Sequence, residues 1–282
     1  MDKANNGLSQ YQNLSSVTDF APELWVKDNT FKGSFSDDFN TFYFFGKVAP
    51  TIEKYVPYQS IFVDGKWQEP QKATYYNKGN SYTYQLKVPN SDELFLLSNK
   101  RTKTDTSATP NYNFWKTKWI DNRYTELIEF KNNDLIYNYN SQPCITENGT
   151  LYFTSDLPDW SKTLSYKMKF DGTTYAEPEL FEPVNKWRES EDWNVFEYCI
   201  SPKEGYMIVC IQDNTLPTPS ADLYISFFKD TTWSYPRRLD DGINTPEAEN
   251  FPTITKDGAY LIFTRGFSEF KIIPTQKLMG KT

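Results

Sequence analysis

The sequence contains no histidine and only three cysteines among its 282 residues. Without histidine, Ser-His-Asp and Cys-His nucleophilic catalysis and the commonest zinc sites are excluded. Three cysteines are too few, and of the wrong parity, for a disulfide framework, so we expect three small buried thiols. No metal site and no cofactor are expected, and any acid–base chemistry would rest on Glu, Asp, Tyr or Lys side chains.

Concentrated positive charge and long apolar runs are missing as well. The net charge is −7 and no stretch is rich in Lys and Arg, which argues against nucleic acid as a partner. No run approaches the roughly 20 apolar residues of a membrane span, and residues 1–10 hold no apolar signal core. We expect a soluble monomer that binds a small molecule, a carbohydrate or a protein. If a leader preceded Met1, the chain would be periplasmic or a surface lipoprotein, and otherwise cytoplasmic.

Aromatic residues are abundant, and short apolar runs recur along the chain. Phe, Trp and Tyr make up 17% of the residues and favour half-buried, pleated strands. Five apolar runs, each preceded by a tight turn and a shorter strand, follow one another at a period of about 55 residues. The runs cover residues 41–45, 94–98, 150–155, 206–211 and 259–264. Together these features predict five strand–turn–strand hairpins.

A second turn and a fourth strand follow in most units. Asp64-Gly65, Asp121-Asn122, Asp171-Gly172 and Asp230-Thr231 are hairpin turn signals. An aromatic residue and usually a proline come next, which is typical of an edge strand. The fifth unit ends without a fourth strand, whereas residues 21–24 resemble 177–180, the end of such a strand. Residues 17–25 are therefore expected to complete the last unit.

This pattern predicts an all-β fold, a five-bladed β-propeller of four-stranded antiparallel blades whose last blade is closed by the N-terminal strand. A ring of this kind leaves only short, protected sheet edges. The propeller would occupy residues 15–282 after a flexible tail over residues 1–14. A six-bladed ring is the alternative, although no sixth turn is found in the sequence.

Several of the units resemble the PD40 repeat, which is WD40-like and of the TolB type. The matching residues are Ser201-Pro202-Lys203-Glu204-Gly205, Thr255-Lys256-Asp257-Gly258 and Thr146-Glu147-Asn148-Gly149. The resemblance implies a propeller from a bacterium. It implies no activity, because propellers of this kind include scaffolds, binding proteins and enzymes.

Candidate site residues follow from aligning the innermost strands on Ser34, Lys87, Cys144, Cys199 and Thr253. Successive side chains of a strand point to opposite faces, so the polar positions of this alignment are expected to line the central channel. The apolar positions Phe35, Val88, Ile145, Ile200 and Ile254 are expected between blades. The candidate ligand-binding residues in the channel are Lys32, Gln85, Lys87, Asn140 and Gln142.

Glu197 and Glu249 lie on the innermost strands of neighbouring units. A carboxylate pair across a channel is the arrangement that glycoside hydrolysis uses, so these are the candidate catalytic residues. Residues 185–193 form the connection richest in charged and aromatic side chains and are expected to be a loop. Its Trp187, Arg188 and Trp193 could contact a ligand by stacking and hydrogen bonding.

The leading hypothesis is a propeller that binds a small polar, carbohydrate or aromatic ligand at the mouth of its channel. One alternative is a histidine-free enzyme of the lyase, cyclase or glycosidase type that uses the channel carboxylates. A second alternative is a protein-interaction scaffold. The sequence alone leaves these three open.

Overall fold

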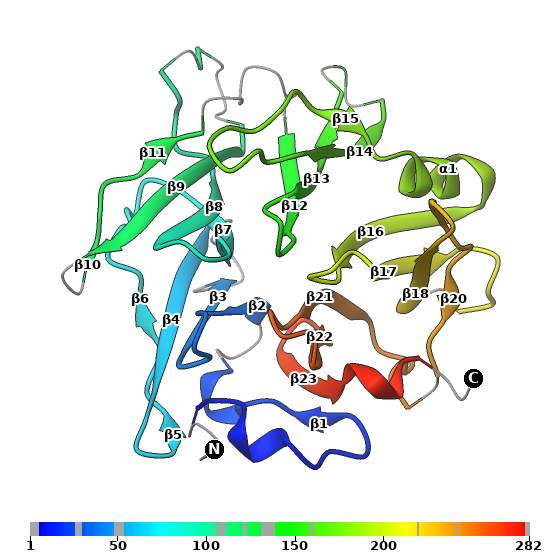
Figure 1. Ribbon diagram of the computed structural model, residues 1–282, viewed down its shortest axis with the longest axis horizontal. Coiled ribbons are helices and arrows are strands. Elements are labelled where there is room, and N and C mark those ends of the chain that lie inside the picture. The colour runs from blue at the N-terminus through cyan, green and yellow to red at the C-terminus, as the bar shows by residue number, and fades with distance from the viewer. Residues whose placement is uncertain are drawn as a thin grey trace.

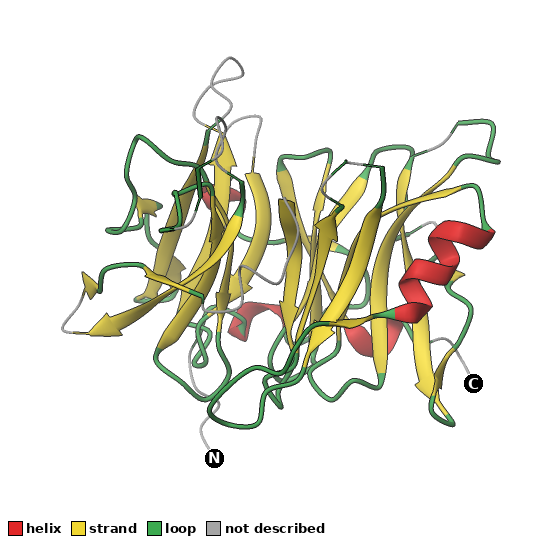
Figure 2. Ribbon diagram, turned by 90° about the horizontal axis from the view of Figure 1, so that it is seen from above, coloured by secondary structure: helices red, strands yellow, loops and turns green. Residues whose placement is uncertain are grey.

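The computed structural model describes residues 6–25, 30–47, 54–103, 105–106, 111–120, 123–130, 139–157, 159, 161–218, 220–240 and 242–279. Five antiparallel sheets surround a central axis in chain order (Figure 1). Seen from the side, their strands run between the two faces of a disc (Figure 2). The five-bladed β-propeller predicted from the repeat is confirmed, and the six-bladed alternative is wrong.

Each blade begins with its innermost strand, and the next strands follow outward. The strands are, for the first blade, β2 (Thr30–Phe35), β3 (Thr41–Lys47), β4 (Tyr55–Val63), β5 (Lys66–Trp67) and β6 (Gln71–Lys72); for the second, β7 (Tyr82–Lys87), β8 (Glu93–Ser98), β9 (Asn113–Ile120), β10 (Arg123–Tyr124) and β11 (Ile128–Glu129); for the third, β12 (Tyr139–Ile145), β13 (Leu151–Asp156), β14 (Thr163–Met168) and β15 (Glu179–Leu180); for the fourth, β16 (Trp193–Ile200), β17 (Tyr206–Asp213), β18 (Ala221–Lys229), β19 (Thr232–Trp233) and β20 (Arg237–Arg238); and for the fifth, β21 (Glu249–Ile254), β22 (Tyr260–Arg265) and β23 (Glu269–Pro274).

The fourth strand is split into two short segments in the first, second and fourth blades. β5 and β6 both pair with β4, β10 and β11 with β9, and β19 and β20 with β18. Pro70 and Pro236 lie between the segments of the first and fourth blades, whereas residues 125–127 of the second blade contain no proline. Proline has no N–H to donate to a ladder, so it interrupts the pairing at the outer edge, where the cost is smallest.

The N-terminal segment closes the ring as the sequence predicted. β1 (Thr18–Asp19) pairs with β23, joining Thr18 to Ile272 and Asp19 to Lys271. In Figure 1 this segment lies along the outer side of β23, so both ends of the chain contribute to one blade. Residues 22–24 of the predicted strand instead form the 3-10 helix η2 (Pro22–Leu24).

The predicted tail boundary at residue 15 stays a prediction. Within residues 6–14, the 3-10 helix η1 (Ser9–Tyr11) holds Tyr11, whose ring is buried with Leu8. The Tyr11 hydroxyl accepts a hydrogen bond of 3.0 Å from the Ala21 backbone N–H. This part of the chain therefore packs against the blade that β1 completes.

The turn residues follow the expected chemistry, but the residue with positive φ shifts in several first turns. Asp64 and Asp230 have φ of 52° and 50°, as the second turns require. In the first turns, Gly149 and Gly258 have positive φ, but Phe39 rather than Asn40 does in the first blade, with φ of 60°, and Glu204 rather than Gly205 does in the fourth, with φ of 57°. A glycine next to the strained position does not fix which residue takes the left-handed conformation.

Residues 182–190, expected to lie largely in a loop, form the helix α1 (Glu182–Ser190). Pro183 in its first turn presets a helical φ, and Glu182 at the start and Arg188 in the last turn complement the helix dipole. Val184 and Trp187, three residues apart, turn to the protein and are buried. The helix covers the outer side of the gap between the third and fourth blades, as its contacts with β14 and β16 show (Figure 1).

Apolar side chains fill the spaces between neighbouring blades. The largest cluster gathers residues of the third, fourth and fifth blades and includes Val209, Cys210 and Phe263, all fully buried. Aromatic rings dominate the cluster at the N-terminal closure, where Phe20 lies 4.8 Å from Phe42 between ring centroids. The aromatic-rich composition thus supplies the packing between sheets.

Candidate functional site

Each of the five innermost strands contains a β-bulge, and the bulges reshape the channel. The pairing shifts between Phe31 and Ser34 in β2, and at the corresponding place in the other four. In four of the strands a residue other than glycine has a positive φ there, between 46° and 55°: Lys32, Tyr84, Gln142 and Phe251. Left-handed non-glycine residues are strained and often accompany ligand sites.

The bulge corrects the sequence alignment of the second blade by one residue. Leu86, not Lys87, is the equivalent of Ser34 and Cys144, and Tyr84, not Gln85, is the equivalent of Lys32. Gln85 therefore does not face the channel. Its amide lies between the first two blades, where Nε2 donates to the Phe44 carbonyl at 2.5 Å and Oε1 accepts from the Tyr75 hydroxyl.

An ion pair crosses the channel from the first blade to the fourth, which are not neighbours in the ring. Lys32 Nζ lies 2.7 Å from Glu197 Oε1 and donates a second hydrogen bond, of 2.6 Å, to the Pro252 carbonyl. The two side chains are 2% and 4% exposed, so the pair is fully enclosed. Burial raises the pKa of Glu197 against the opposing effect of Lys32. Burial acts to lower the pKa of Lys32, but the charge and hydrogen bond of Glu197, together with the nearby cysteines, raise the pKa overall.

On one side of this ion pair lies a cavity of about 560 Å³, which we call the loop-side cavity. It is bordered by the connection between the second and third strands in the fourth and fifth blades, which supply Ser220 and Phe267, and by the connection before β21, which supplies Pro246. Four aromatic rings form its walls, and Glu197 is part of its lining; the rings are Tyr84, Phe196, Phe251 and Phe267. Its volume is within the range of small-molecule sites.

Two residues in the lining of the loop-side cavity have amide atoms with unmet hydrogen-bonding capacity. Gln142 Oε1 and Asn250 Nδ2 are buried atoms with no partner among the described residues. The Asn250 Oδ1 atom accepts from the Cys210 thiol at 3.2 Å, which leaves the amino group for other contacts. Buried amide groups without partners are costly, so each one calls for an explanation.

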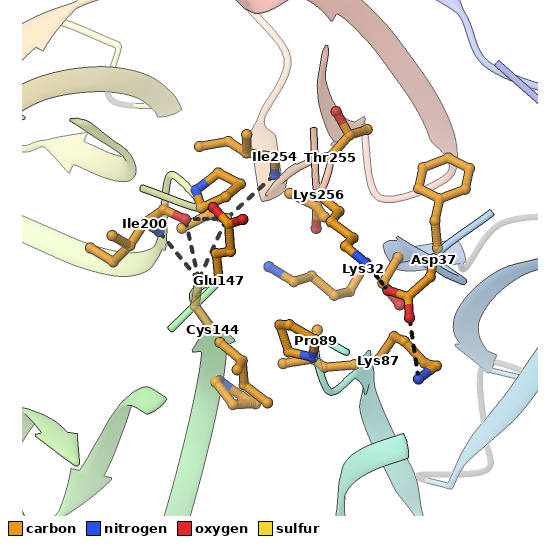
Figure 3. A pocket seen from close by; sticks show the side chains of 18 residues that line it. Lys32, Asp37, Lys87, Pro89, Cys144, Glu147, Ile200, Ile254, Thr255 and Lys256 are labelled. Carbon is orange, nitrogen blue, oxygen red and sulfur yellow. Dashed lines mark hydrogen bonds and ion pairs between the residues drawn. The ribbon is translucent and has the colours of Figure 1, made fainter. Parts of the chain in front are cut away.

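On the other side of the ion pair lies a smaller cavity of about 90 Å³, the turn-side cavity. Its mouth is formed by the first turns of the blades, with Asp37, Glu147 and Lys256 among them (Figure 3). Lys32 reaches into its centre, and Cys144 and Cys199 lie on its wall. Lys87 also lines it, with Nζ 3.7 Å from the Asp37 carboxylate, and burial lowers the pKa of this lysine.

The apolar positions Phe35, Ile145, Ile200 and Ile254, expected between blades, pack in the hydrophobic clusters between the sheets, and they line the turn-side cavity as well.

Glu249 borders neither of the two cavities. One of its carboxylate oxygens accepts from Arg265 Nε at 2.8 Å and from the Thr245 hydroxyl at 2.7 Å, and the other from the Thr245 backbone N–H at 3.0 Å. Its side chain is fully buried, and burial raises its pKa against these hydrogen bonds. The assignment of Glu197 and Glu249 as a pair of catalytic carboxylates stays a prediction. Glu197 lines the loop-side cavity, whereas Glu249 does not.

The remaining candidates lie outside the channel cavities. Asn140 is buried between the second and third blades, where Nδ2 donates to the Tyr112 carbonyl at 3.2 Å. Trp187 is a core residue beneath α1, and Arg188 bridges the Ser165 hydroxyl and the Val195 carbonyl at 2.8 and 3.2 Å. Trp193, at the start of β16, packs on Tyr224 and Tyr235 of the same blade.

The site also contains residues that the sequence analysis did not single out as ligand-binding. Phe196 is 39% exposed and Phe267 is 46% exposed, unusual for phenylalanine, and both line the loop-side cavity. Phe196 is the extra residue of the bulge in β16. In a regular strand Phe196 would share the side of the apolar Ile200, so the strand alternation gave no signal that this side chain reaches the channel.

Two structural properties bear on the classes of function considered. In the described part of the chain, no helix combines the length and apolar character that crossing a membrane requires. Among the same residues, no three His, Cys, Asp or Glu side chains gather as metal ligands.

Comparison with known proteins defines the class as a β-propeller. No family model matches the sequence, and none of the curated proteins matches it. Among solved structures, a gluconolactonase from Xanthomonas campestris is similar at 9% identity and a TM-score of 0.50, over 92% of this chain and 89% of that one. The native arabinanase of Bacillus subtilis is similar at 11% identity and a TM-score of 0.51, over 89% of this chain and 96% of that one.

At these identities the likeness concerns the fold alone. The β-propeller is therefore established, whereas the resemblance of the repeat to PD40, and the bacterial origin that it implies, stay predictions.

Proposed function

We propose that the protein is a ligand-binding propeller whose loop-side cavity takes a small carbohydrate or a similar hydroxyl-rich ring compound. The observation that carries this proposal is the pairing of unsatisfied amides with exposed aromatic rings in one cavity. Gln142 Oε1 needs a donor and Asn250 Nδ2 needs an acceptor. A sugar hydroxyl can serve as either, and the apolar face of a sugar ring stacks on aromatic side chains.

The charge of the cavity fits a neutral ligand. Glu197 lies in its lining, but Lys32 neutralises it from the turn side at 2.7 Å. A strongly charged ligand would have to compete with this ion pair, whereas a neutral polyol would not. The bulges hold Tyr84, Gln142 and Phe251 in the left-handed conformation before any ligand arrives, which reduces the ordering cost of binding.

The proposal is tested by calorimetric titration of the full chain with neutral mono- and disaccharides. We expect saturable binding of at least one sugar, and Gln142→Ala should weaken it about tenfold, the effect of losing one buried hydrogen bond of about 1.4 kcal/mol. Gln71→Ala is the matched control, because Gln71 is exposed on the outer edge of the first blade. Absence of binding across the sugars, or equal effects of both substitutions, would refute the proposal.

A histidine-free enzyme is the second candidate, and one observation favours it. Glu197 lines the cavity with a raised pKa, and such carboxyls serve as general acids or bases. Glu197→Gln also leaves Lys32 without its partner, so the variant is assayed at a temperature where it stays folded; it should then abolish turnover of a bound glycoside while leaving the affinity within about threefold. Loss of binding without any turnover in the parent protein would favour the binding function.

A further inference from the structure

Two of the three cysteines meet in the turn-side cavity. Cys144 in β12 and Cys199 in β16 occupy equivalent positions in the third and fourth blades. Their sulfur atoms lie 3.7 Å apart, in direct contact. Both thiols are free, and both line the cavity that opens between the first turns (Figure 3). The wall of the cavity therefore presents a dithiol.

Backbone N–H groups face both sulfur atoms. Ile200 N–H donates to Cys144 Sγ at 3.2 Å, and Ile254 N–H donates to Cys199 Sγ at 3.4 Å. Such donors stabilise sulfur that carries negative charge. Lys32 adds a positive charge from the centre of the same cavity. These contacts stabilise negative charge on sulfur, as a positively charged histidine does in other reactive thiol sites.

We propose that Cys144 and Cys199 form a peroxide-sensitive dithiol that hydrogen peroxide oxidises to a disulfide linking the third and fourth blades. The turn-side cavity admits the oxidant. Its volume of about 90 Å³ exceeds what one water molecule requires, roughly 10–15 Å³ on the same measure, so a molecule the size of hydrogen peroxide fits. This site lies across the ion pair from the proposed sugar cavity and does not depend on it.

The reaction balances without any further reagent. The Cys199 thiolate attacks one peroxide oxygen, the S–O bond forms, the O–O bond breaks, and the leaving hydroxide takes a proton to become water. Cys199 is then a sulfenic acid. The Cys144 sulfur gives up its proton and attacks the Cys199 sulfur, the S–S bond forms, and the S–O bond breaks with release of a second water. Two thiols and one peroxide thus yield one disulfide and two waters.

The surroundings assign Cys199 as the attacking sulfur. The hydrogen bond from Cys144 lowers the pKa of Cys199, with help from the charge of Lys32 and against the effect of burial. The same hydrogen bond, together with burial, raises the pKa of Cys144, which keeps its proton. Closing the disulfide needs the sulfurs about 1.7 Å nearer to one another, a distance that side-chain rotation and small strand shifts can cover.

The test is oxidation of the full chain with equimolar hydrogen peroxide, followed by thiol blocking, digestion and mass spectrometry. We expect one peptide pair joined between Cys144 and Cys199, with Cys210 still reduced. Because the bridge closes a long loop, the oxidised protein should unfold about 5 °C higher than the reduced form. Equal oxidation of all three cysteines, or oxidation only after unfolding, would overturn the proposal without any variant.

Single substitutions separate the two roles. Cys144→Ser should stop at the Cys199 sulfenic acid, which dimedone traps, and Cys199→Ser should slow oxidation of Cys144 at least tenfold. Cys210→Ser is the matched control: Cys210 is also fully buried, but it lies outside the cavity and bonds the Glu249 carbonyl at 3.3 Å. Its oxidation pattern should equal that of the parent. Identical peroxide rates in the Cys144 and Cys199 variants would refute the assignment.

Discussion

The two ends of the channel are built from the same five strands, yet they differ in size and chemistry. The loop-side cavity measures about 560 Å³ and has aromatic walls with unsatisfied amides. The turn-side cavity measures about 90 Å³ and is lined by cysteines, lysines and carboxylates. The connections vary between blades whereas the first turns repeat, so the loop side gains room and the turn side stays narrow.

The ion pair of Lys32 and Glu197 lies where the two cavities approach each other. Lys32 lines the turn-side cavity, Glu197 lines the loop-side cavity, and the two side chains meet between the cavities. A buried ion pair contributes little net stability, but loss of one partner leaves an uncompensated charge. The pair therefore specifies a closed channel more than it strengthens the fold.

The largest expected effect comes from removing one charge of the Lys32–Glu197 ion pair. Lys32→Met alone should lower the free energy of unfolding by about 3–5 kcal/mol, because Glu197 would remain buried without its partner. The double variant Lys32→Met, Glu197→Leu should recover most of that loss. Urea denaturation of the three proteins measures the difference, and a double variant no more stable than the single one would show that the pair is a true source of stability.

A smaller effect is expected from changing only the loop side. Phe196→Ala should weaken sugar binding about fivefold, or about 1 kcal/mol, since it removes part of an aromatic wall. Peroxide oxidation of the thiols should proceed at the parent rate, because Phe196 is not in the turn-side lining. Calorimetry and thiol mass mapping on the same preparation test both statements, and a change in the thiol rate would mean that the two cavities are coupled.

The smallest expected effect is a difference in pH dependence between the two ends. The pKa of Cys199 is lowered by Cys144 and Lys32, so its thiolate forms at a lower pH than that of an ordinary cysteine. Alkylation of Cys199 should therefore reach half its maximal rate at a lower pH than alkylation of a cysteine in a short unstructured peptide measured alongside. Sugar binding between pH 7 and 9 should stay constant within about twofold, as the amides of Gln142 and Asn250 do not titrate. An alkylation midpoint at or above that of free cysteine would contradict the role of Lys32.

The repeat and its closure could be predicted because they depend on local patterns. Apolar runs, Asp-Gly turns and the similarity of residues 21–24 to 177–180 report strands and their order directly. The bulges could not be predicted in the same way. A single inserted residue moves Tyr84 into the place given to Gln85 without altering the composition of the strand.

The contacts across the channel could not be predicted from the sequence either. Cys144 and Cys199 were aligned correctly, but the 3.7 Å between their sulfurs depends on the packing of two blades. The contact of Lys32 with Glu197 joins blades that are not neighbours, so it depends on the radius of the whole ring. The helix α1 was not predicted, because tryptophan and arginine side chains such as Trp187 and Arg188 are equally consistent with a ligand-binding loop and with a partly buried helix.

The strand β1 sets the order of events when the chain is made. Asp19 leaves the ribosome early, but its partner Lys271 lies 252 residues later. At about 5–20 residues per second, the first strand waits roughly 13–50 s for the sheet that it completes. During synthesis the last blade therefore stays incomplete until β23 has been made, and only then can β1 pair with it.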